Sequence, residues 1–163
     1  MKSQQLENLL GKNISKLSKI IGEEFENELF DSSFYYIKNE STKKNLYGMQ
    51  YNSVTVLTDE KDNIKSISIH FDKTINKYFY ESFIEDYKKP NNILVIEASE
   101  TTSEGFLEGK PFNQKLRKNN IQLREGKFDE NPLFIVWTKE DYEIKFFFRY
   151  NSNSSEVTYT LLH

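Results

Sequence analysis

Most catalytic and metal sites are built from histidine, cysteine and paired carboxylates, and this chain has few of the first two. Its 163 residues include two histidines and no cysteine. A chain without thiols forms no disulfide and offers no thiolate ligand or nucleophile. His70 and His163 would need converging carboxylates to bind zinc, and their spacing indicates none. No Gly-x-Ser-x-Gly elbow accompanies His70 either, so the sequence predicts no metal site, no cofactor and no catalytic residue.

One glycine-containing stretch, Gly105-Phe-Leu-Glu-Gly-Lys-Pro111, shares part of the pattern of a phosphate-binding loop. It is one residue too short between its glycines, and it has proline where a Ser or Thr would coordinate magnesium. We therefore interpret the stretch as a turn that leads into a helix.

An acidic run from Glu23 to Asp31 contains five acids in nine residues. A paired-carboxylate hydrolase would need one acid buried near another, and a calcium loop needs a ligand order that the run lacks. Two other interpretations fit the run better: a solvated helix end, or a docking surface whose charge attracts a basic partner. In the second, the candidate partner-binding residues are Glu23, Glu24, Glu26 and Glu28.

The charge balance argues against nucleic acid as a partner. The formal net charge is -3 at pH 7, whereas nucleic-acid-binding domains usually have a clearly basic surface. Basic residues gather between Lys110 and Lys127, but few aromatic side chains lie among them to stack on bases. The apolar runs Leu133–Trp137 and Phe146–Phe148 are too short to span a bilayer, and the N-terminus lacks the apolar region of a signal peptide. We therefore expect a cytoplasmic protein that binds neither nucleic acid nor membrane.

Large side chains on otherwise polar strand faces are the better indication of a binding surface. Phe147 shares one face of a predicted strand with Lys145 and Arg149, and Trp137 lies near the end of another strand. Trp, Tyr and Arg are the residue types that anchor interfaces. Trp137, Phe147 and Arg149 are therefore candidate partner-binding residues. The alternative for Trp137 is a place in the core beneath the helix Ile75–Tyr87.

The segment Tyr51–Phe71 has the alternation of a β-hairpin. Apolar residues recur at every second position on both arms, and the turn between them is polar. This period of two marks strands with one buried face. The intervening residues Ser66, Ser68 and His70 are small or polar, so the other face of the sheet should meet solvent or a partner.

Helices are expected on both sides of this hairpin. Two short helices precede residue 22, and Asn13 is a plausible N-cap for the second. After the hairpin, apolar residues recur at every fourth position from Ile75 to Tyr87, a stripe that can lie across a sheet face. Asp72 or Thr74 would cap this helix and Pro90 would end it.

The remaining chain is expected to be mainly β. Ser99–Lys110 is interpreted as a loop, and Pro111 as the start of a short helix that bears Phe112 and Leu116. The expected strands are Phe34–Lys38, Ile93–Ala98, Ile121–Arg124, Leu133–Thr138, Tyr142–Tyr150 and Glu156–Leu162.

These elements are typical of an α+β domain in which helices pack on one face of an antiparallel sheet of meanders. We expect one domain spanning residues 1–163. The order of helix, strand and hairpin recurs weakly, which suggests two pseudo-repeats of about residues 1–71 and 72–163 that share one sheet.

The run Leu10-Gly-Lys-Asn-Ile-Ser-Lys-Leu-Ser-Lys-Ile-Ile-Gly22, followed by the antiparallel hairpin, resembles the helix-then-meander unit of the SmpA/BamE and β-lactamase-inhibitor-protein (BLIP-like) superfamily. The resemblance covers the chain up to the end of the hairpin, and the inhibitor proteins are tandems of two such units. It implies a scaffold that presents a curved sheet to another protein. The chain departs from the inhibitor proteins, which carry disulfides, because it has no cysteine.

Together these patterns favour a non-enzymatic protein-binding domain of the immunity or inhibitor type. Such a domain neutralises a toxin or enzyme by covering its active site, and the expected partner here is another protein, such as a basic toxin. The alternative is a small-molecule or lipid-binding module with a pocket between the aromatic helix and the sheet. An enzyme of unrecognised type and an outer-membrane assembly component are further alternatives.

Overall fold

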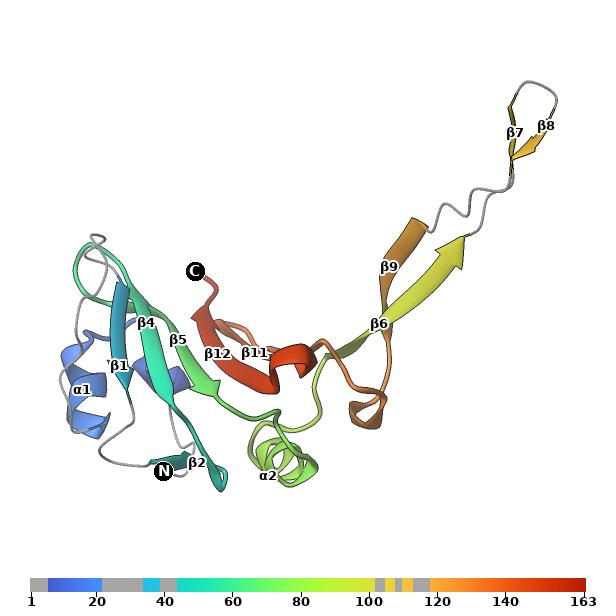
Figure 1. Cartoon of the computed structure of the whole chain (residues 1–163). Coiled ribbons are helices and arrows are strands. Elements are labelled where there is room, and N and C mark those ends of the chain that lie inside the picture. The colour runs from blue at the N-terminus through green and yellow to red at the C-terminus, as the bar shows by residue number, and fades with distance from the viewer. Residues whose placement is uncertain (1–5, 22–33, 39–43, 102–104, 108–109, 113–117) are drawn as a thin grey trace.

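The computed structural model describes residues 6–21, 34–38, 44–101, 105–107, 110–112 and 118–163. Within these residues, an eight-stranded antiparallel sheet has the order β1-β4-β5-β12-β11-β10-β6-β9 (Figure 1). We call it the main sheet. Its strands are β1 (Phe34–Lys38), β4 (Ser53–Thr58), β5 (Ile64–Phe71), β6 (Asn92–Thr101), β9 (Lys118–Glu125), β10 (Phe134–Thr138), β11 (Tyr142–Arg149) and β12 (Ser154–Leu161).

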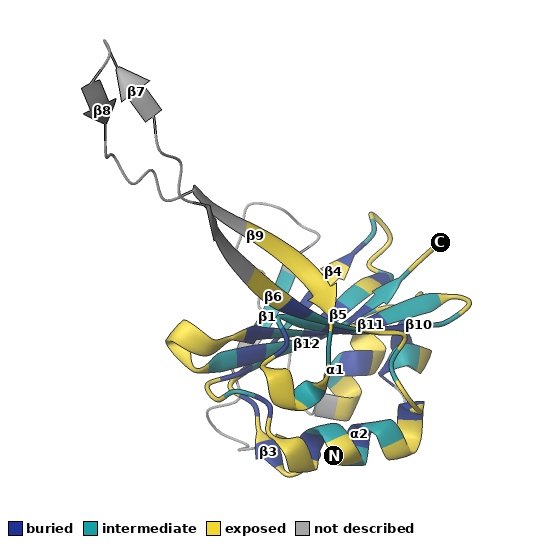
Figure 2. Ribbon diagram, turned by 90° about the vertical axis from the view of Figure 1, so that its right-hand side faces the viewer, coloured by how far each residue is buried: buried dark blue, intermediate teal, exposed yellow. Residues whose placement is uncertain are grey.

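The described chain also contains smaller elements. The short antiparallel pairs are β2 (Asn45–Leu46) with β3 (Met49–Gln50) and β7 (Gly105–Leu107) with β8 (Lys110–Phe112). The helices are α1 (Ser15–Ile21) and α2 (Lys77–Tyr87), and the 3-10 turns are Glu7–Leu9, Phe128–Glu130 and Tyr150–Ser152. Both α1 and α2 lie on the same side of the main sheet (Figure 2). The expected α+β class is confirmed, with the sheet as the dominant part.

The predicted hairpin is formed by β4 and β5. Val54 stands opposite Ile69 and Val56 opposite Ile67, and all of these side chains are buried. A buried apolar row on both strands is what their period of two requires. The residues between them in β5, such as Ser68 and His70, are partly exposed on the other face, as expected.

The aromatic helix α2 is also confirmed, but its N-cap differs from the expected one. The cap is Asn76, whose side-chain oxygen accepts a hydrogen bond from the backbone N–H of Phe79 at 2.9 Å. The two expected caps have other partners: Asp72 accepts from Asn52 at 2.7 Å, and the hydroxyl of Thr74 donates to Asn153 at 3.0 Å. The helix ends at Tyr87, ahead of Pro90.

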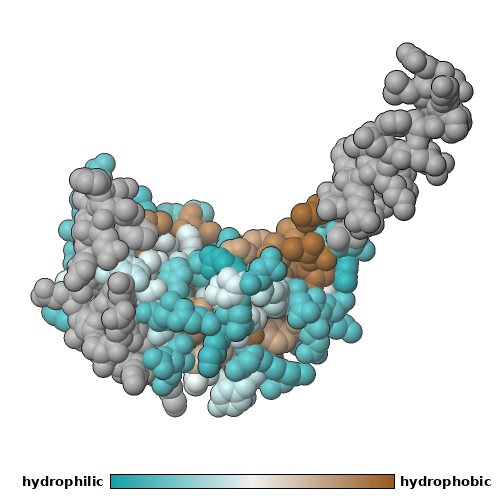
Figure 3. Space-filling view, in the orientation of Figure 1, coloured by the Kyte–Doolittle hydropathy of each residue, from teal (hydrophilic) through white to brown (hydrophobic). Residues whose placement is uncertain are grey.

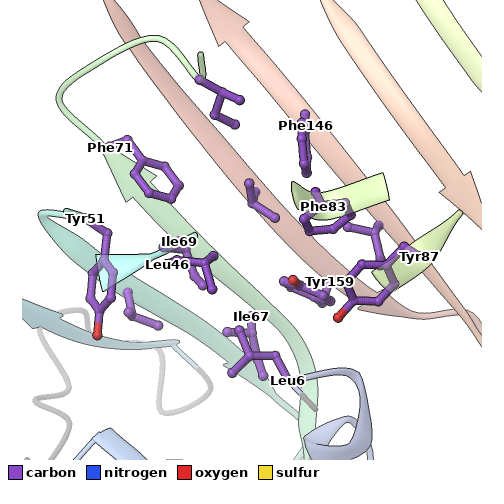
Figure 4. Close-up of a cluster of buried hydrophobic side chains, with 14 of the residues drawn as sticks. Leu6, Leu46, Tyr51, Ile67, Ile69, Phe71, Phe83, Tyr87, Phe146 and Tyr159 are labelled. Atoms are coloured by element: carbon purple, nitrogen blue, oxygen red, sulfur yellow. The ribbon is translucent and has the colours of Figure 1, made fainter. Parts of the chain in front are cut away.

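The core lies between the main sheet and the two helices. Phe83 of α2 is fully buried, and its ring centroid is 4.7 Å from that of Phe146 and 4.9 Å from that of Trp137. Figure 4 shows Phe83, Phe146 and Tyr159 side by side in this layer. The rings pack mostly edge-to-face or tilted, which are favourable geometries for aromatic pairs.

The N-terminal segment contributes to the same core. Leu17 of α1 is fully buried, and Asn13 accepts a hydrogen bond from the backbone N–H of Ser15 at 3.1 Å, in keeping with its expected capping role. The first expected helix is a single 3-10 turn, Glu7–Leu9. Gly22, the expected end of α1, lies outside the described residues.

The segment after residue 98 differs most from expectation. Ser99–Thr101 continue β6 and pair with Lys118–Asn120 of β9, so the expected loop begins later. Lys110–Phe112 form strand β8 rather than the start of a helix, and Leu116 lies outside the described residues. The β6–β9 hairpin extends away from the body of the protein (Figures 1 and 2). We call its outer part, residues 95–101 and 118–124, the arm.

The C-terminal meander matches the sequence-based expectation closely. Strands β10, β11 and β12 are consecutive neighbours in the main sheet. In β11, Ile144, Phe146 and Phe148 are buried toward the helices, whereas Lys145 and Phe147 point to the opposite side. Among the described residues, helices therefore cover one face of the main sheet and none covers the other, which we call the open face.

Candidate functional site

The open face presents one continuous row of side chains across five strands. In register, His70 of β5 stands opposite Glu156 of β12, which stands opposite Phe147 of β11. The row continues through Phe134 of β10 to Leu94 of β6. Its composition changes along the way, from polar and charged on β5 and β12 to aromatic and aliphatic on the strands nearer the arm.

The polar half of this row is a connected cluster. The Thr55 hydroxyl lies 2.9 Å from His70 Nε2, and His70 Nδ1 lies 3.4 Å from the Glu156 carboxylate. The same carboxylate accepts hydrogen bonds from Arg149 at 3.0 Å and from the Thr158 hydroxyl at 2.8 Å. The contact with His70, followed by those with Arg149 and Thr158, lowers the pKa of Glu156 from 4.5 to about 2.

The order hydroxyl, imidazole, carboxylate in this cluster is also the order of a catalytic triad. The hydroxyl here belongs to a mid-strand threonine, Thr55, and the Glu156 carboxylate is shared with Arg149 and Thr158 rather than dedicated to His70. We therefore interpret the cluster as a cross-strand network that holds the open face in shape. The His, Asp and Glu residues of the described chain form no group of three that could hold a metal ion.

The aromatic half of the row stacks with cationic groups. The rings of Phe134 and Phe147 are stacked with centroids 5.0 Å apart. The Arg149 guanidinium lies 4.3 Å from the centroid of Phe147, and the Lys145 ammonium 5.7 Å from that of Phe134. Arg149 therefore joins both halves of the row, because it contacts Phe147 and Glu156 at once. Aromatic and arginine side chains held in this way are typical of protein interfaces.

Exposed apolar residues continue the surface onto the arm. Ile96, Leu123 and Ile121 are 49, 48 and 69% exposed. Ile96 stands opposite Leu123, and the alternation of side chains places all three on the same face of the hairpin as Leu94. Figure 3 shows the corresponding brown patch where the arm leaves the body. Contiguous exposed apolar groups with a polar surround mark interaction sites in many proteins.

The sequence-predicted partner-binding residues are placed differently by the structure. Phe147 and Arg149 lie on the open face and contact each other. Trp137, in contrast, does not lie on the surface, which corrects its assignment as a candidate partner-binding residue. Its side chain is fully buried beneath α2, and its indole N–H donates to the Lys88 carbonyl at 2.9 Å. It belongs to the core, which was the stated alternative. Glu23, Glu24, Glu26 and Glu28 lie outside the described residues.

Other residues of this surface were not singled out from the sequence. Ile121 and Leu123 alternate with Gln122 and Arg124, a pattern that indicates a strand with one apolar face. That pattern normally means a buried face, so only the position of β9 at the sheet edge reveals that the apolar side is exposed. Glu156 lacked a clear local signal, because its charged and imidazole partners, Arg149 and His70, come from β11 and β5.

The space between α2 and the sheet is filled by aromatic rings rather than by a pocket. Phe83 packs on Trp137 and Phe146, whose own centroids are 4.8 Å apart. Hollows of about 520 and 860 Å³ occur elsewhere, the first beside Thr55 and Arg149 on the open face and the second between Tyr36 and the segment before α2. Both have mixed polar and apolar walls.

Comparison with known proteins adds no relative: no family model, curated protein or solved structure matches the chain. None of the helices that the structure describes has the length and apolar composition needed to span a bilayer.

Replacing Glu156 by glutamine should reveal how much the polar cluster stabilises the fold. Because the folded-state pKa of Glu156 is lowered, its contribution is complete above pH 4.5 and is lost as the pH falls toward 2. We expect Glu156→Gln to reduce the free energy of unfolding by about 1–2 kcal/mol at neutral pH, discounted for the screening of a partly exposed pair. Denaturant titrations of both proteins between neutral pH and pH 2 measure this difference, which should vanish at the acid end. A difference that stays constant with pH, or that also occurs in the exposed control Glu81→Gln, would contradict the assignment.

Proposed function

We propose that this chain is a non-enzymatic protein-binding domain of the immunity or inhibitor type, which neutralises a toxin or enzyme by covering its active site. The observation that carries the proposal is a continuous surface that runs from Arg149 through the half-buried rings of Phe147 and Phe134 to the exposed Ile121 and Leu123 on the arm. Exposed apolar groups of this extent have an unfavourable free energy in water unless a partner covers them.

The shape of this surface suits an inhibitor. The arm projects beyond the body at one end of the open face (Figure 1). The apolar side chains of the arm can pack against a partner, while the open face covers the surface around that contact. Arg149 can contribute polar contacts at the centre, since its guanidinium is already held by Glu156 and needs little ordering when a partner binds.

The proposal has further parts that derive from the sequence. The acidic residues Glu23, Glu24, Glu26 and Glu28 would speed association with a basic partner by electrostatic steering. The partner would be a protein, not nucleic acid or membrane, and both would act in the cytoplasm. We also propose that the chain comprises two BLIP-like units, of about residues 1–71 and 72–163, that share the main sheet.

The experiment that tests the function is a pull-down with the full chain as bait from cells that natively express it, with the adjacent reading frame sequenced alongside. A single stoichiometric protein partner whose activity is lost on adding the chain would support the proposal. A chain that retains a small molecule, detected by native mass spectrometry, and captures no protein would overturn it. That outcome would favour the alternative, a small-molecule or lipid-binding module, with the hollow beside Tyr36 as its site.

A further inference from the structure

The outer edge of β9 is open for hydrogen bonding. In the part of the chain that the structure describes, β9 has β6 on one side and no strand on the other. Residues Ile121 to Glu125 are all exposed. Natural proteins usually protect such edges with proline, a bulge or charge, because an open edge is a template for another strand. Ile121, Gln122 and Leu123 supply none of these protections.

The hydrogen-bond pattern shows which backbone groups face outward. The N–H of Gly126 donates to the Ile93 carbonyl at 2.9 Å, so Gly126 points its backbone groups at β6. Because these directions alternate along an antiparallel strand, Arg124 and Gln122 also point at β6, whereas Leu123 and Ile121 point away from it. The outward groups therefore belong to the two residues with apolar side chains.

We propose that β9 pairs with β9 of a second copy of this chain, antiparallel and with Gln122 on the two-fold axis. This register places Ile121 of each copy opposite Leu123 of the other. Both residues point their backbone groups outward, so each of the two opposed pairs forms two hydrogen bonds, N–H to carbonyl in both directions. A two-fold axis perpendicular to the sheet keeps the apolar side chains of both copies on one face.

Neighbouring registers are less favourable. An axis at Leu123 would oppose Ile121 to Glu125, and an axis at Ile121 would oppose Lys118 to Arg124, two like charges. With the axis at Gln122, Arg124 falls opposite Asn120 and no like charges meet. Arg124 and Glu125 are in any case held within their own chain, by Glu130 at 2.9 Å and Asn92 at 2.9 Å. The self-complementarity of this short strand is what favours a second copy over a foreign strand.

The arrangement has a geometric consequence for the open face. Antiparallel pairing sends the two bodies to opposite ends of the joined arms, which extend away from their bodies (Figure 1). The two open faces then lie on the same side, and Ile96, Ile121 and Leu123 of both copies form one patch. The inference is independent of the proposed function, and experiment separates the two. A dimer that captures no partner would contradict only the function, and a monomer that captures a partner would contradict only this inference.

The test uses single cysteines, because the natural chain has none. The full-length variants Ile121→Cys, Gln122→Cys and Leu123→Cys are oxidised mildly and analysed on non-reducing gels. Gln122 meets its own copy across the axis, in a non-hydrogen-bonded pair whose spacing suits a disulfide. We expect Gln122→Cys to form the covalent dimer at least about tenfold faster than Ile121→Cys or Leu123→Cys alone. In those two variants, the cysteines of the two copies are displaced from each other along the strands, and their Cα atoms lie farther apart than a disulfide can bridge. A mixture of Ile121→Cys and Leu123→Cys should form the heterodimer.

Light scattering of the wild-type chain at rising concentration is the second measurement. We expect a dimer that Leu123→Pro abolishes, because proline removes an outward N–H while leaving the pairing with β6 intact. A wild-type chain that stays monomeric and a Gln122→Cys variant that does not cross-link would overturn the proposal. Fastest cross-linking at Leu123 would overturn the register, and a disulfide from Gln122→Cys to a different protein would overturn the second copy as the occupant.

Discussion

Replacing Phe83 by alanine is expected to lower the free energy of unfolding by about 3–5 kcal/mol, a large fraction of the roughly 5–15 kcal/mol that is typical of a folded domain. Phe83 is fully buried at the centre of α2, and its ring contacts Trp137, Phe146 and Tyr87. Truncation removes the transfer free energy of the ring and leaves a cavity that these rigid neighbours cannot close. Urea unfolding followed by tryptophan fluorescence measures the loss, since Trp137 is 4.9 Å from the mutated ring.

Tyr78→Ala is the matched control, because it removes an aromatic ring from the same helix at a position that is 68% exposed. A surface substitution of this kind should change stability by less than about 0.5 kcal/mol. If the two variants lost equal stability, the loss would not depend on burial, and core packing would not be its cause. If Phe83→Ala lost almost none, the layer between α2 and the sheet could not be the packed core described above.

Elements with strong local periodicity were predictable from the sequence. The hairpin of β4 and β5, the aromatic stripe of α2 and the strands β10 to β12 each have a repeating apolar pattern that matches one kind of element. The cap of α2 was less predictable, because Asp72, Thr74 and Asn76 can all cap a helix. Asp72 and Thr74 bond instead to Asn52 and Asn153, which lie far from α2 in sequence.

The arm could not be predicted from local pattern alone. Ser99 and Glu100 belong to a stretch rich in Glu, Ser, Thr and Gly, a composition that normally indicates a loop. They are strand residues because they pair with Asn120 and Asn119 of β9. Likewise Pro111 was interpreted as the start of a short helix, but Pro111 and Phe112 pair with Phe106 and Gly105. In each case the strand depends on a partner that a short window of sequence does not contain.

The candidate surface was predictable in part. The parity of β11 placed Phe147 and Arg149 together on the face opposite the core, and the structure brings them into contact at 4.3 Å. The alternation of side chains alone could not say which face of β10 is covered by a helix. Trp137 was therefore both a candidate partner-binding residue and a candidate core residue. The order of the strands and the position of α2 decide this, because the helix lies over the face that carries Trp137 and Phe146.

Phe147 is expected to be the main anchor of partner binding on the open face. Its ring lies between the Arg149 guanidinium and the Phe134 ring, so it is pre-organised and its burial by a partner costs little side-chain entropy. Residues of this kind, central and surrounded by polar groups, supply most of the binding free energy in interfaces. We expect Phe147→Ala to weaken binding of the partner isolated by pull-down by about 2 kcal/mol, close to 30-fold in Kd.

Titration calorimetry with the purified partner measures this change, and Tyr78→Ala again serves as the control because α2 lies on the opposite side of the sheet. Phe134→Ala should weaken binding as well, and the double variant should lose less than the sum of the two single losses, because the two stacked rings support each other. Full affinity in Phe147→Ala, together with lost affinity in Tyr78→Ala, would place the interface on the helical side and remove the open face from the proposal.

The ionic strength adds a further distinction. The loss of affinity in Phe147→Ala should be nearly independent of salt, whereas the contribution of the acidic run from Glu23 to Asp31 should fall as salt screens its charges. The two parts of the proposed mechanism, apolar anchoring and electrostatic steering, can therefore be measured separately on the same complex.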